Sequence, residues 1–312
     1  MKKKITIATR GSMLALWQAN HIKDSIEKTH AGTTVELLKI KTTGDKILDV
    51  PLAKVGGKGL FVKEIEEALL DGRADLAVHS LKDVPTELPE GLGLAAITER
   101  EDARDALISN GNKKLSELPQ GAKVGSSSLR RQCQLLKVRP DLNIVSLRGN
   151  LDTRIKKVES GEFDAIILAA AGMRRLGWEE RISECISSDI LLPAIAQGAL
   201  GIETRNNDDQ INEIIAFLNH SGTSAAVRAE RALLKRLEGG CQVPIAAYGE
   251  LEGGTLRLRG LVGSLDGKTL ITDELTGSIA EPERLGVDLA EILLDKGAGE
   301  ILEEIYKMGL GK

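Results

Sequence analysis

Aromatic residues are scarce in this chain of 312 residues, where Phe, Trp and Tyr together make up 2% of the sequence. Proteins that bind single-stranded nucleic acid commonly stack the bases on aromatic side chains, so this scarcity argues against such a role. The formal net charge of −4 argues in the same direction, because a phosphate backbone attracts an excess of Lys and Arg. We therefore expect no nucleic-acid partner.

Cysteine is also rare, and long apolar runs are missing. The three cysteines, Cys133, Cys185 and Cys241, lie far apart and form no C-x-x-C pair, which argues against a disulfide framework and against a zinc site. No stretch has the length of a membrane span, and no apolar secretory core follows the basic start M-K-K-K. The sequence thus predicts a cytoplasmic protein with no metal and no membrane partner.

Apolar residues are plentiful at 42% of the sequence, which is enough for the two or three domains that this length suits. We expect a first α/β domain from residues 1–99 and 200–217, a second from 100–199, and a smaller α+β domain from 218–312. In the last one, strands are expected at 245–251 and 256–262, followed by two helices. The chain would then cross twice between the α/β domains, as in hinged, periplasmic-binding-protein-like pairs that hold a ligand between them.

The stretch Asp75–Pro85, D-L-A-V-H-S-L-K-D-V-P, is the first candidate site. Its short apolar run predicts a buried strand, and Ser80, Lys82 and Asp83 follow where that strand should end. The proline bars further ladder pairing because it has no N–H. Ligands in open α/β sheets lie at the carboxyl ends of strands, although an isolated turn of this kind can also be merely solvated.

Arginine recurs at turns that follow predicted strands. Ser12 is a good N-cap in A-T-R-G-S, so Arg10 is expected beside free helical N–H groups. Between residues 123 and 175 the order of strand, small-residue turn and helix occurs three times, with Arg at or just beyond each turn. A single such Arg is usually solvated or ion-paired. Several that converge with helix N-termini suit a small polyanion.

Two glycine-rich segments complete the candidates. Residues 42–59 combine glycines with lysines but lack G-x-x-x-x-G-K-[ST], which favours a mobile basic flap over a phosphate loop. Near the end of a predicted helix, a glycine pair directly precedes Cys241. Glycine pairs end helices and expose the residues after them, so we expect this thiol on a loop, where it is chemically available.

An ordered set of motifs resembles the porphobilinogen deaminase (hydroxymethylbilane synthase) family. The motifs occur in that family's order, run to about residue 247 and are A-T-R-G-S, V-G-G-K-G-L-F, D-L-A-V-H-S-L-K-D-V-P, V-G-S-S-S-L-R-R, L-R-G-N-L-D-T-R, I-L-A-A-A-G, L-P-A-I-A-Q-G-A-L-G-I-E and E-G-G-C-Q-V-P-I-A. Any one of them is weak, but the ordered set is specific.

The resemblance implies a transferase of porphyrin and heme biosynthesis. Such an enzyme condenses four porphobilinogen molecules head to tail, releases ammonia each time and acts as a monomer. The resemblance also implies a dipyrromethane cofactor, held by a thioether to Cys241 as a primer. Asp83 matches the family's catalytic aspartate, and a carboxylate there would stabilise the cationic intermediate and assist the proton steps.

The same resemblance implies roles for the remaining candidates, position by position. Cofactor binding falls to Lys82, Ser128, Arg130, Arg131, Arg148 and Arg154. Substrate binding falls to Arg10, Ser12, Ser80 and Arg175 and, from the flap, to Lys54, Lys58 and Phe61. For Phe61 core packing is an equal alternative, and Arg174 can simply be solvated.

Two other functions compete with this interpretation. A non-catalytic hinged protein that binds a small organic polyanion would share the fold and the arginines, but it would have no use for Asp83 and the Gly-Gly-Cys loop together. A phosphoryl-transfer enzyme is disfavoured, because the sequence has neither a Walker motif nor an obvious carboxylate pair for a metal.

Overall fold

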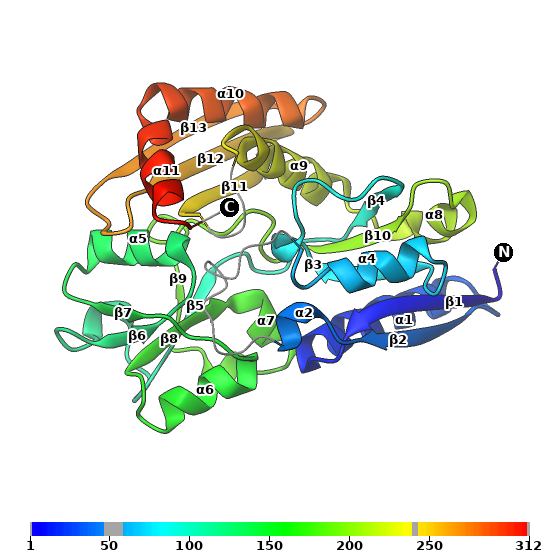
Figure 1. Cartoon of the computed structure of the whole chain (residues 1–312), viewed down its shortest axis with the longest axis horizontal. Coiled ribbons are helices and arrows are strands. Elements are labelled where there is room, and N and C mark those ends of the chain that lie inside the picture. The colour runs from blue at the N-terminus through cyan, green and yellow to red at the C-terminus, as the bar shows by residue number, and fades with distance from the viewer. Residues whose placement is uncertain (1, 47–58, 239–242, 311–312) are drawn as a thin grey trace. The chain divides into compact units, whose positions relative to one another are not determined.

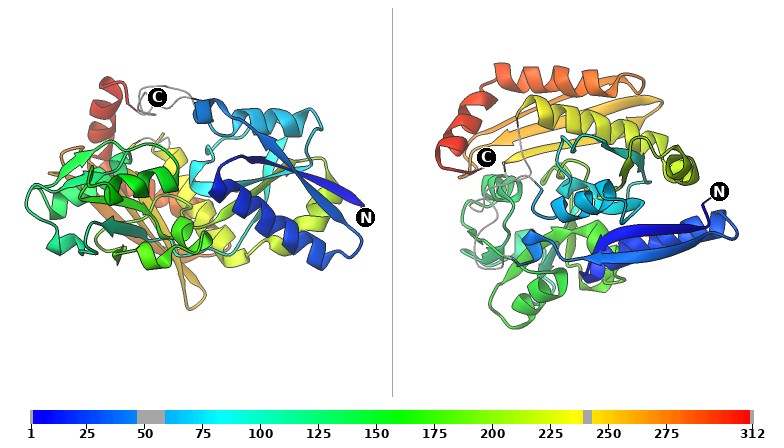
Figure 2. Two further views of the ribbon diagram at one scale, coloured as in Figure 1. Left: turned by 90° about the horizontal axis from the view of Figure 1, so that it is seen from below. Right: turned by 45° about the vertical axis from the view of Figure 1, so that its right-hand side comes forward.

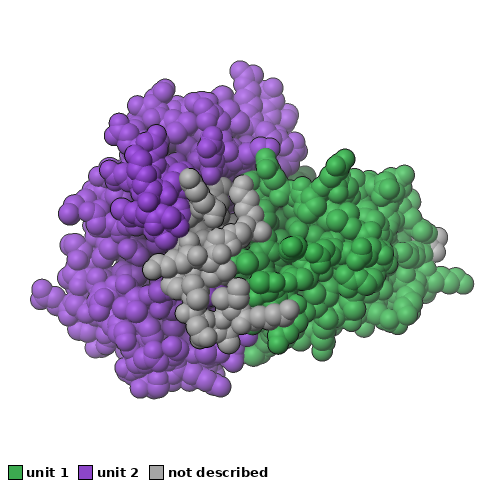
Figure 3. All heavy atoms as spheres, in the orientation of Figure 1, with its two compact units in different colours: residues 1–48, 57–101, 199–224 green, residues 49–56, 102–198, 225–312 purple. Residues whose placement is uncertain are grey.

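The computed structural model describes residues 2–46, 59–238 and 243–310, which form the helices and strands that Figure 1 shows. Internal contacts divide the chain into two compact units, which Figure 3 colours separately. Unit 1 consists of residues 1–48, 57–101 and 199–224, and unit 2 of residues 49–56, 102–198 and 225–312. The domain boundaries expected at 99/100, 199/200 and 217/218 stay a prediction.

Unit 1 is built on a five-stranded sheet with the order β2-β1-β3-β10-β4. Its strands are β1 (Lys4–Arg10), β2 (Thr34–Ile40), β3 (Leu76–Ser80), β4 (Leu92–Ile97) and β10 (Leu200–Arg205). β1 is parallel to β2 and β3, whereas β10 runs antiparallel to both β3 and β4. The carboxyl ends of β1 and β3 therefore meet at one edge of the sheet, the edge where such sheets bind ligands.

Helices cover both faces of this sheet, because alternate residues of its strands are apolar on each side. The helical segments are α1 (Met13–Thr29), α2 (Thr43–Lys46), α4 (Lys63–Leu70), α8 (Asp209–Ile215) and the 3₁₀ turns η1 (Leu81–Asp83) and η4 (Ala216–Leu218). α1 and α8 pack on the face of Ile5 and Ile7, and α4 packs on the face of Ala8 and Ala77. The predicted cap is confirmed, since Ser12 Oγ accepts a hydrogen bond from Ala15 N at the start of α1.

The first sheet of unit 2 has the same strand pattern, with the order β7-β6-β8-β5-β9. Its strands are β5 (Asp105–Ser109), β6 (Lys123–Gly125), β7 (Asn143–Val145), β8 (Ala165–Ala169) and β9 (Glu184–Ile186). β6 is parallel to β7 and β8, whereas β5 is antiparallel to β8 and β9. In each of the two sheets the fourth strand is therefore the antiparallel one.

Helices also cover both faces of this second sheet. They are α5 (Leu129–Val138), α6 (Leu151–Glu159) and α7 (Ala170–Arg175), with 3₁₀ turns η2 (Leu115–Glu117) and η3 (Glu179–Arg181). Leu135 of α5 packs with Val124 in one apolar cluster, and Ile155 of α6 packs with Ile166 in another. α5, α6 and α7 each start just after a strand of this sheet.

The carboxyl-terminal part of unit 2 is an antiparallel sheet in the order β11-β12-β13 with helices on it, seen from two further sides in Figure 2. The elements are β11 (Ile245–Glu252), β12 (Thr255–Gly263), β13 (Leu270–Ser278), α9 (Ser221–Arg236), α10 (Pro282–Asp295) and α11 (Ala298–Lys307). α9 and α10 meet on one face, because a Cβ on Gly260 would touch Leu233 of α9 and Leu293 of α10, each at 3.0 Å. β13 was missing from the sequence prediction.

The predicted fold class is confirmed: the chain forms two α/β sheet domains and, at its carboxyl-terminal end, a smaller α+β domain. Of the helices that the structure describes, none combines the length and the apolar character needed to span a membrane.

Candidate active site

The turn that bears Asp83 follows β3 directly, as η1. Ser80 ends the strand, and its Oγ accepts a hydrogen bond from Gln18 Nε2 of α1 at 2.8 Å. The Leu81 N–H donates to Ala199 O at 3.1 Å, which ties the turn to the residue before β10. Asp83 itself is exposed, and Lys82 is half-buried. Asp83 is therefore exposed on a turn that two hydrogen bonds fix, one to α1 and one to the residue before β10.

Beneath this turn lies a buried acidic cluster. His79 of β3 is 6% exposed and Glu203 of β10 is fully buried, and His79 Nε2 lies 2.8 Å from Glu203 Oε2. Because a carboxylate can only accept, Nε2 carries the proton in this contact. Glu66 of α4 is also buried, and burial, together with the charge of Glu203, raises its pKa to about 7. From the sequence, no role was assigned to His79, and the two glutamates were not singled out.

Arg10, the last residue of β1, already has partners in unit 1. Its Nε lies 3.2 Å from Asp45 Oδ1, and its Nη2 forms an ion pair with the same carboxylate. Its guanidinium also stacks over the Phe61 ring, 4.3 Å from the centroid. Burial opposes ionisation of Asp45, but the contacts with Arg10 lower the pKa of that carboxyl overall. The structure thus brings Arg10, Asp45 and Phe61 together, and Asp45 was not predicted.

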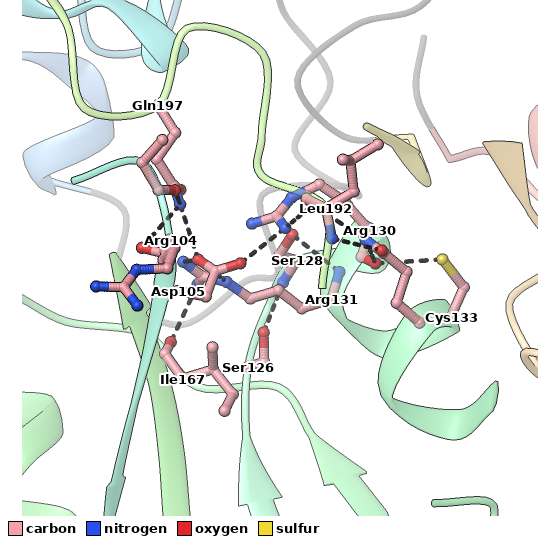
Figure 4. A network of polar contacts seen from close by, with 12 residues as sticks. Arg104, Asp105, Ser126, Ser128, Arg130, Arg131, Cys133, Ile167, Leu192 and Gln197 are labelled. Carbon is pink, nitrogen blue, oxygen red and sulfur yellow. Dashed lines mark hydrogen bonds and ion pairs between the residues drawn. The ribbon is translucent and has the colours of Figure 1, made fainter. Parts of the chain in front are cut away.

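In unit 2, Arg130 and Arg131 share the carboxylate of Asp105, as Figure 4 shows. Arg130 Nη1 donates to Asp105 Oδ2 at 2.8 Å, and Arg131 Nη2 donates to Asp105 Oδ1 at 2.7 Å. Gln197 Nε2 reaches the same Oδ1 at 3.0 Å. Burial works against the charge of Asp105, yet the two guanidinium groups hold its pKa well below its usual range.

This network is buried but not neutral. Two guanidinium groups against one carboxylate leave one net positive charge, and Arg130 and Arg131 are 3% and 7% exposed. The Arg130 Nε is buried and has no hydrogen-bond partner among the described residues. Ser128 caps α5, since its Oγ accepts from Arg131 N at 3.4 Å, which aligns the network with the start of the helix. Such a site favours an anion.

The other predicted arginines of unit 2 are half-buried: Arg148 lies between β7 and α6, Arg154 lies in α6, and Arg175 ends α7. Arg154 Nε donates to Gly149 O at 2.8 Å, and Gly149 has φ of +110°, which only glycine adopts readily. Arg175 Nη2 donates to Gly198 O at 2.6 Å. Arg174 pairs with Asp102 at 2.9 Å, so it is ion-paired and not merely solvated.

Three predicted site residues, Cys241, Lys54 and Lys58, lie outside the described residues, as does most of the expected flap at 42–59. The other two cysteines are described. Cys133 is fully buried, and burial raises the pKa of its thiol to about 12, whereas Cys185 is half-buried. The described residues contain no group of three or more His, Cys, Asp or Glu side chains that could hold a metal ion.

Comparison with known families gives two matches that together span most of the chain. Residues 5–213 match the model described as "Porphobilinogen deaminase, dipyromethane cofactor binding domain", and residues 224–295 match "Porphobilinogen deaminase, C-terminal domain". The chain belongs to the porphobilinogen deaminase family.

Curated relatives of the porphobilinogen deaminase family match over nearly the full length. The chain is 61% identical over 305 residues to a porphobilinogen deaminase of Geobacter metallireducens, covering 98% of this chain and 96% of the relative. It is 60% identical over 304 residues to one of Geobacter sulfurreducens, covering 97% and 95%. These matches do not favour the non-catalytic binding protein that the sequence left open.

Solved structures also match parts of the chain at low sequence identity. The periplasmic VFT2 domain of Bordetella pertussis BvgS matches 69% of this chain and 86% of its own length, with 14% identity and a TM-score of 0.41. A putative methionine-binding lipoprotein of Bacillus subtilis matches 69% of this chain and 88% of its own, with 14% identity and a TM-score of 0.42.

The described residues fit the dipyrromethane cofactor for which the matching porphobilinogen deaminase domain is named. This cofactor carries acetate and propionate side chains, and the buried network at the start of α5 holds one uncompensated positive charge. The partnerless Arg130 Nε–H is a donor that no described protein group satisfies. Both the net positive charge and the unsatisfied donor favour a ligand that carries a carboxylate.

Replacing Asp105 with Asn should destabilise this porphobilinogen deaminase fold strongly. Two buried guanidinium groups would lose their carboxylate, a change that typically costs about 3–5 kcal/mol. The matched control is Asp141→Asn, because Asp141 pairs with Arg139 at a partly exposed position, where ion pairs contribute far less. Urea unfolding followed by circular dichroism measures both variants, and equal losses would contradict the importance of the Asp105 network.

Replacing Glu66 with Gln should change how stability depends on pH. The folded protein holds the Glu66 proton up to about pH 7, whereas the unfolded chain releases it near 4.5, so the wild type loses stability as the pH rises between these values. Gln cannot ionise. Relative to Glu66→Gln, the wild type should lose roughly 3 kcal/mol between pH 4 and pH 8, at about 1.4 kcal/mol per pKa unit.

The control for this measurement is Glu213→Gln, at an exposed position of α8. Its unfolding free energy should follow that of the wild type across the same pH range. A Glu66→Gln variant that also runs parallel to the wild type would show that Glu66 is not protonated in the fold.

Proposed function

We propose that this chain condenses four porphobilinogen molecules head to tail to hydroxymethylbilane, with release of ammonia at each step. The observation that carries this proposal is family membership across 98% of the chain together with an exposed carboxylate, Asp83, at the end of β3. When bound, the dipyrromethane cofactor supplies the primer end that the added rings extend. We propose Cys241 as its point of attachment through a thioether.

Asp83 is proposed as the catalytic residue. Loss of the aminomethyl nitrogen from porphobilinogen leaves a cationic pyrrole electrophile, and a fixed carboxylate lowers the energy of such a cation. A carboxylate in the same place can also take up and return a proton. The hydrogen bonds of Ser80 to Gln18 and of Leu81 to Ala199 favour this role, because they fix the turn on which Asp83 lies.

The cationic residues are proposed to bind the acidic side chains of the pyrroles. Cofactor binding is assigned to Lys82, Ser128, Arg130, Arg131, Arg148 and Arg154, and substrate binding to Arg10, Ser12, Ser80, Lys54, Lys58, Phe61 and Arg175. For Arg130 and Arg131 the net positive charge of their network with Asp105 supports this assignment. For Arg10, the assignment is supported by the adjacent ring of Phe61, which has a flat surface on which a pyrrole can stack.

The remaining expectations are proposals of the same kind. We propose three domains, residues 1–99 with 200–217, residues 100–199 and residues 218–312, with residues 42–59 as a flap. The family resemblance supports a cytoplasmic monomer that acts on a small molecule, without nucleic-acid or membrane partners. The family match runs through both sheet domains and the α+β domain, in accord with one enzyme built from all three.

The intact mass of the purified protein tests the proposed cofactor. We expect an excess equal to two linked pyrroles in the wild type and none in Cys241→Ser, because the thioether needs that sulfur. Cys185→Ser is the matched control, since Cys185 is a half-buried free thiol, and this variant should keep the excess. An unmodified wild-type protein that still turns over porphobilinogen would refute the proposal.

Substitution of Asp83 tests the catalytic assignment. Asp83→Glu should keep slow turnover, because the carboxylate remains but is displaced, whereas Asp83→Ala should lose roughly 10²- to 10⁴-fold in kcat. Consumption of porphobilinogen is the measurement. Asp71→Ala, another exposed acid of unit 1, should leave the rate unchanged. Near-normal rates in both Asp83 variants would remove this residue from catalysis.

A further inference from the structure

The buried cluster of His79, Glu203 and Glu66 has no part in the chemistry proposed above. Two of its members come from motifs that the function leaves unexplained, since His79 precedes the S-L-K-D turn and Glu203 ends the L-P-A-I-A-Q-G-A-L-G-I-E motif. Buried ionisable groups are costly, so they persist where they do something for the fold or the site.

The cluster shares a face of the sheet with the turn that carries Asp83. Gly201 lies opposite His79 in the β3–β10 ladder, and Glu203 lies two residues further along β10, on the same side as Gly201. A Cβ on Gly201 would meet Leu81 Cδ1 at 2.7 Å, so the first residue of the turn rests on this glycine. The His79–Glu203 contact and the Leu81–Gly201 contact therefore support the turn side by side.

The cluster contains two carboxyl groups and one imidazole. Glu203 Oε2 accepts from His79, but Glu203 Oε1 is buried and has no partner among the described residues. Burial and the charge of Glu203 raise the pKa of Glu66, whereas the charge of His79 lowers it. Two ionised carboxylates in this buried space would repel each other, and a proton on Glu66 removes the repulsion.

Apart from His79, the described basic residues of the elements packed here are either exposed, as is Lys63 of α4, or paired outside the cluster. α4 packs against β1, β3, β4 and β10. β4 contains no titratable residue, and the basic residues of β1 and β10, Lys4, Arg10 and Arg205, form ion pairs with carboxylates outside the cluster. On α4 itself, Glu67 adds a further negative charge near Glu66.

We propose that His79 and Glu203 are positioning residues that fix the Leu81–Asp83 turn through their contact with each other. This inference rests on the proposed role of Asp83 in the condensation. It predicts that the rate of the chemical step, and not the binding of substrate, depends on this contact.

A pair of His79 variants tests the contact. His79→Leu removes the donor, whereas His79→Gln keeps an N–H near the place of Nε2. We expect His79→Leu to lower kcat roughly 10- to 100-fold with KM little changed, because a displacement of about 1 Å at a reacting group can cost that much. His79→Gln should restore most of kcat. Equal kcat values in wild type, His79→Leu and His79→Gln would overturn the proposal.

Variants of Glu203 provide a second test, which applies even if His79→Leu fails to fold. Glu203→Gln keeps an oxygen that can accept from His79 Nε2, so its kcat should stay close to that of the wild type. Glu203→Leu removes the acceptor and should lower kcat roughly 10- to 100-fold with KM little changed. A wild-type kcat in Glu203→Leu would overturn the positioning role of this contact.

Hydrogen exchange at the Leu81 amide separates this proposal from the catalytic one, because it needs no activity. In the Asp83→Ala background, the Leu81 N–H should stay protected through its bond to Ala199 O and should exchange at least about tenfold faster when His79→Leu is added. Unchanged protection would refute positioning by the cluster. An active Asp83→Ala enzyme with lost protection would instead refute the catalytic role of Asp83.

Discussion

The burial of charge at the ends of strands is the constraint on which this structure depends. Asp105 begins β5 with no exposed surface, and two guanidinium groups from the start of α5 converge on its carboxylate. An isolated charge in that position would be prohibitive, and a pair is tolerable only with full hydrogen bonding. Gln197 and the carbonyl oxygens of Leu192 and Ile167 supply much of that bonding, while Arg130 Nε is left without a partner among the described residues.

The same principle operates in unit 1 with the opposite sign. There, two carboxylates and one imidazole are buried below the Asp83 turn, and the pKa of Glu66 rises to accommodate them. Unit 2 thus keeps an unbalanced positive charge, whereas the cluster in unit 1 relieves its negative charge with a proton. An enzyme that handles an acidic pyrrole chain and a cationic electrophile would need both kinds of environment.

The residues that sequence reasoning found are those whose roles are local. Ser12 caps the helix that directly follows it, and the polar turn after Val78 follows from a strand that ends in Ser80. The missed residues act across long separations. Asp105 ends the charged run Glu99–Asp105 near the domain boundary expected at 99/100, and nothing nearby in the sequence pairs it with Arg130, 25 positions onward.

Strand register explains why Glu203 was missed. Glu203 meets His79 only because β10 pairs antiparallel with β3, over a separation of 124 residues.

β13 was missed because it is an edge strand with little burial, and its residues include the polar Asp273, Glu274 and Thr276. Single-sequence periodicity detects a buried strand well and detects a half-exposed edge poorly.

The order of strands in the two sheets has a consequence for synthesis on the ribosome. All strands of the second sheet lie within one continuous stretch, from Asp105 to Ile186, so that sheet can close soon after it emerges. The first sheet cannot, because β10 starts at Leu200 and inserts between β3 and β4. The amino-terminal strands are translated first, but their sheet lacks β10 until all strands of the second sheet have been made.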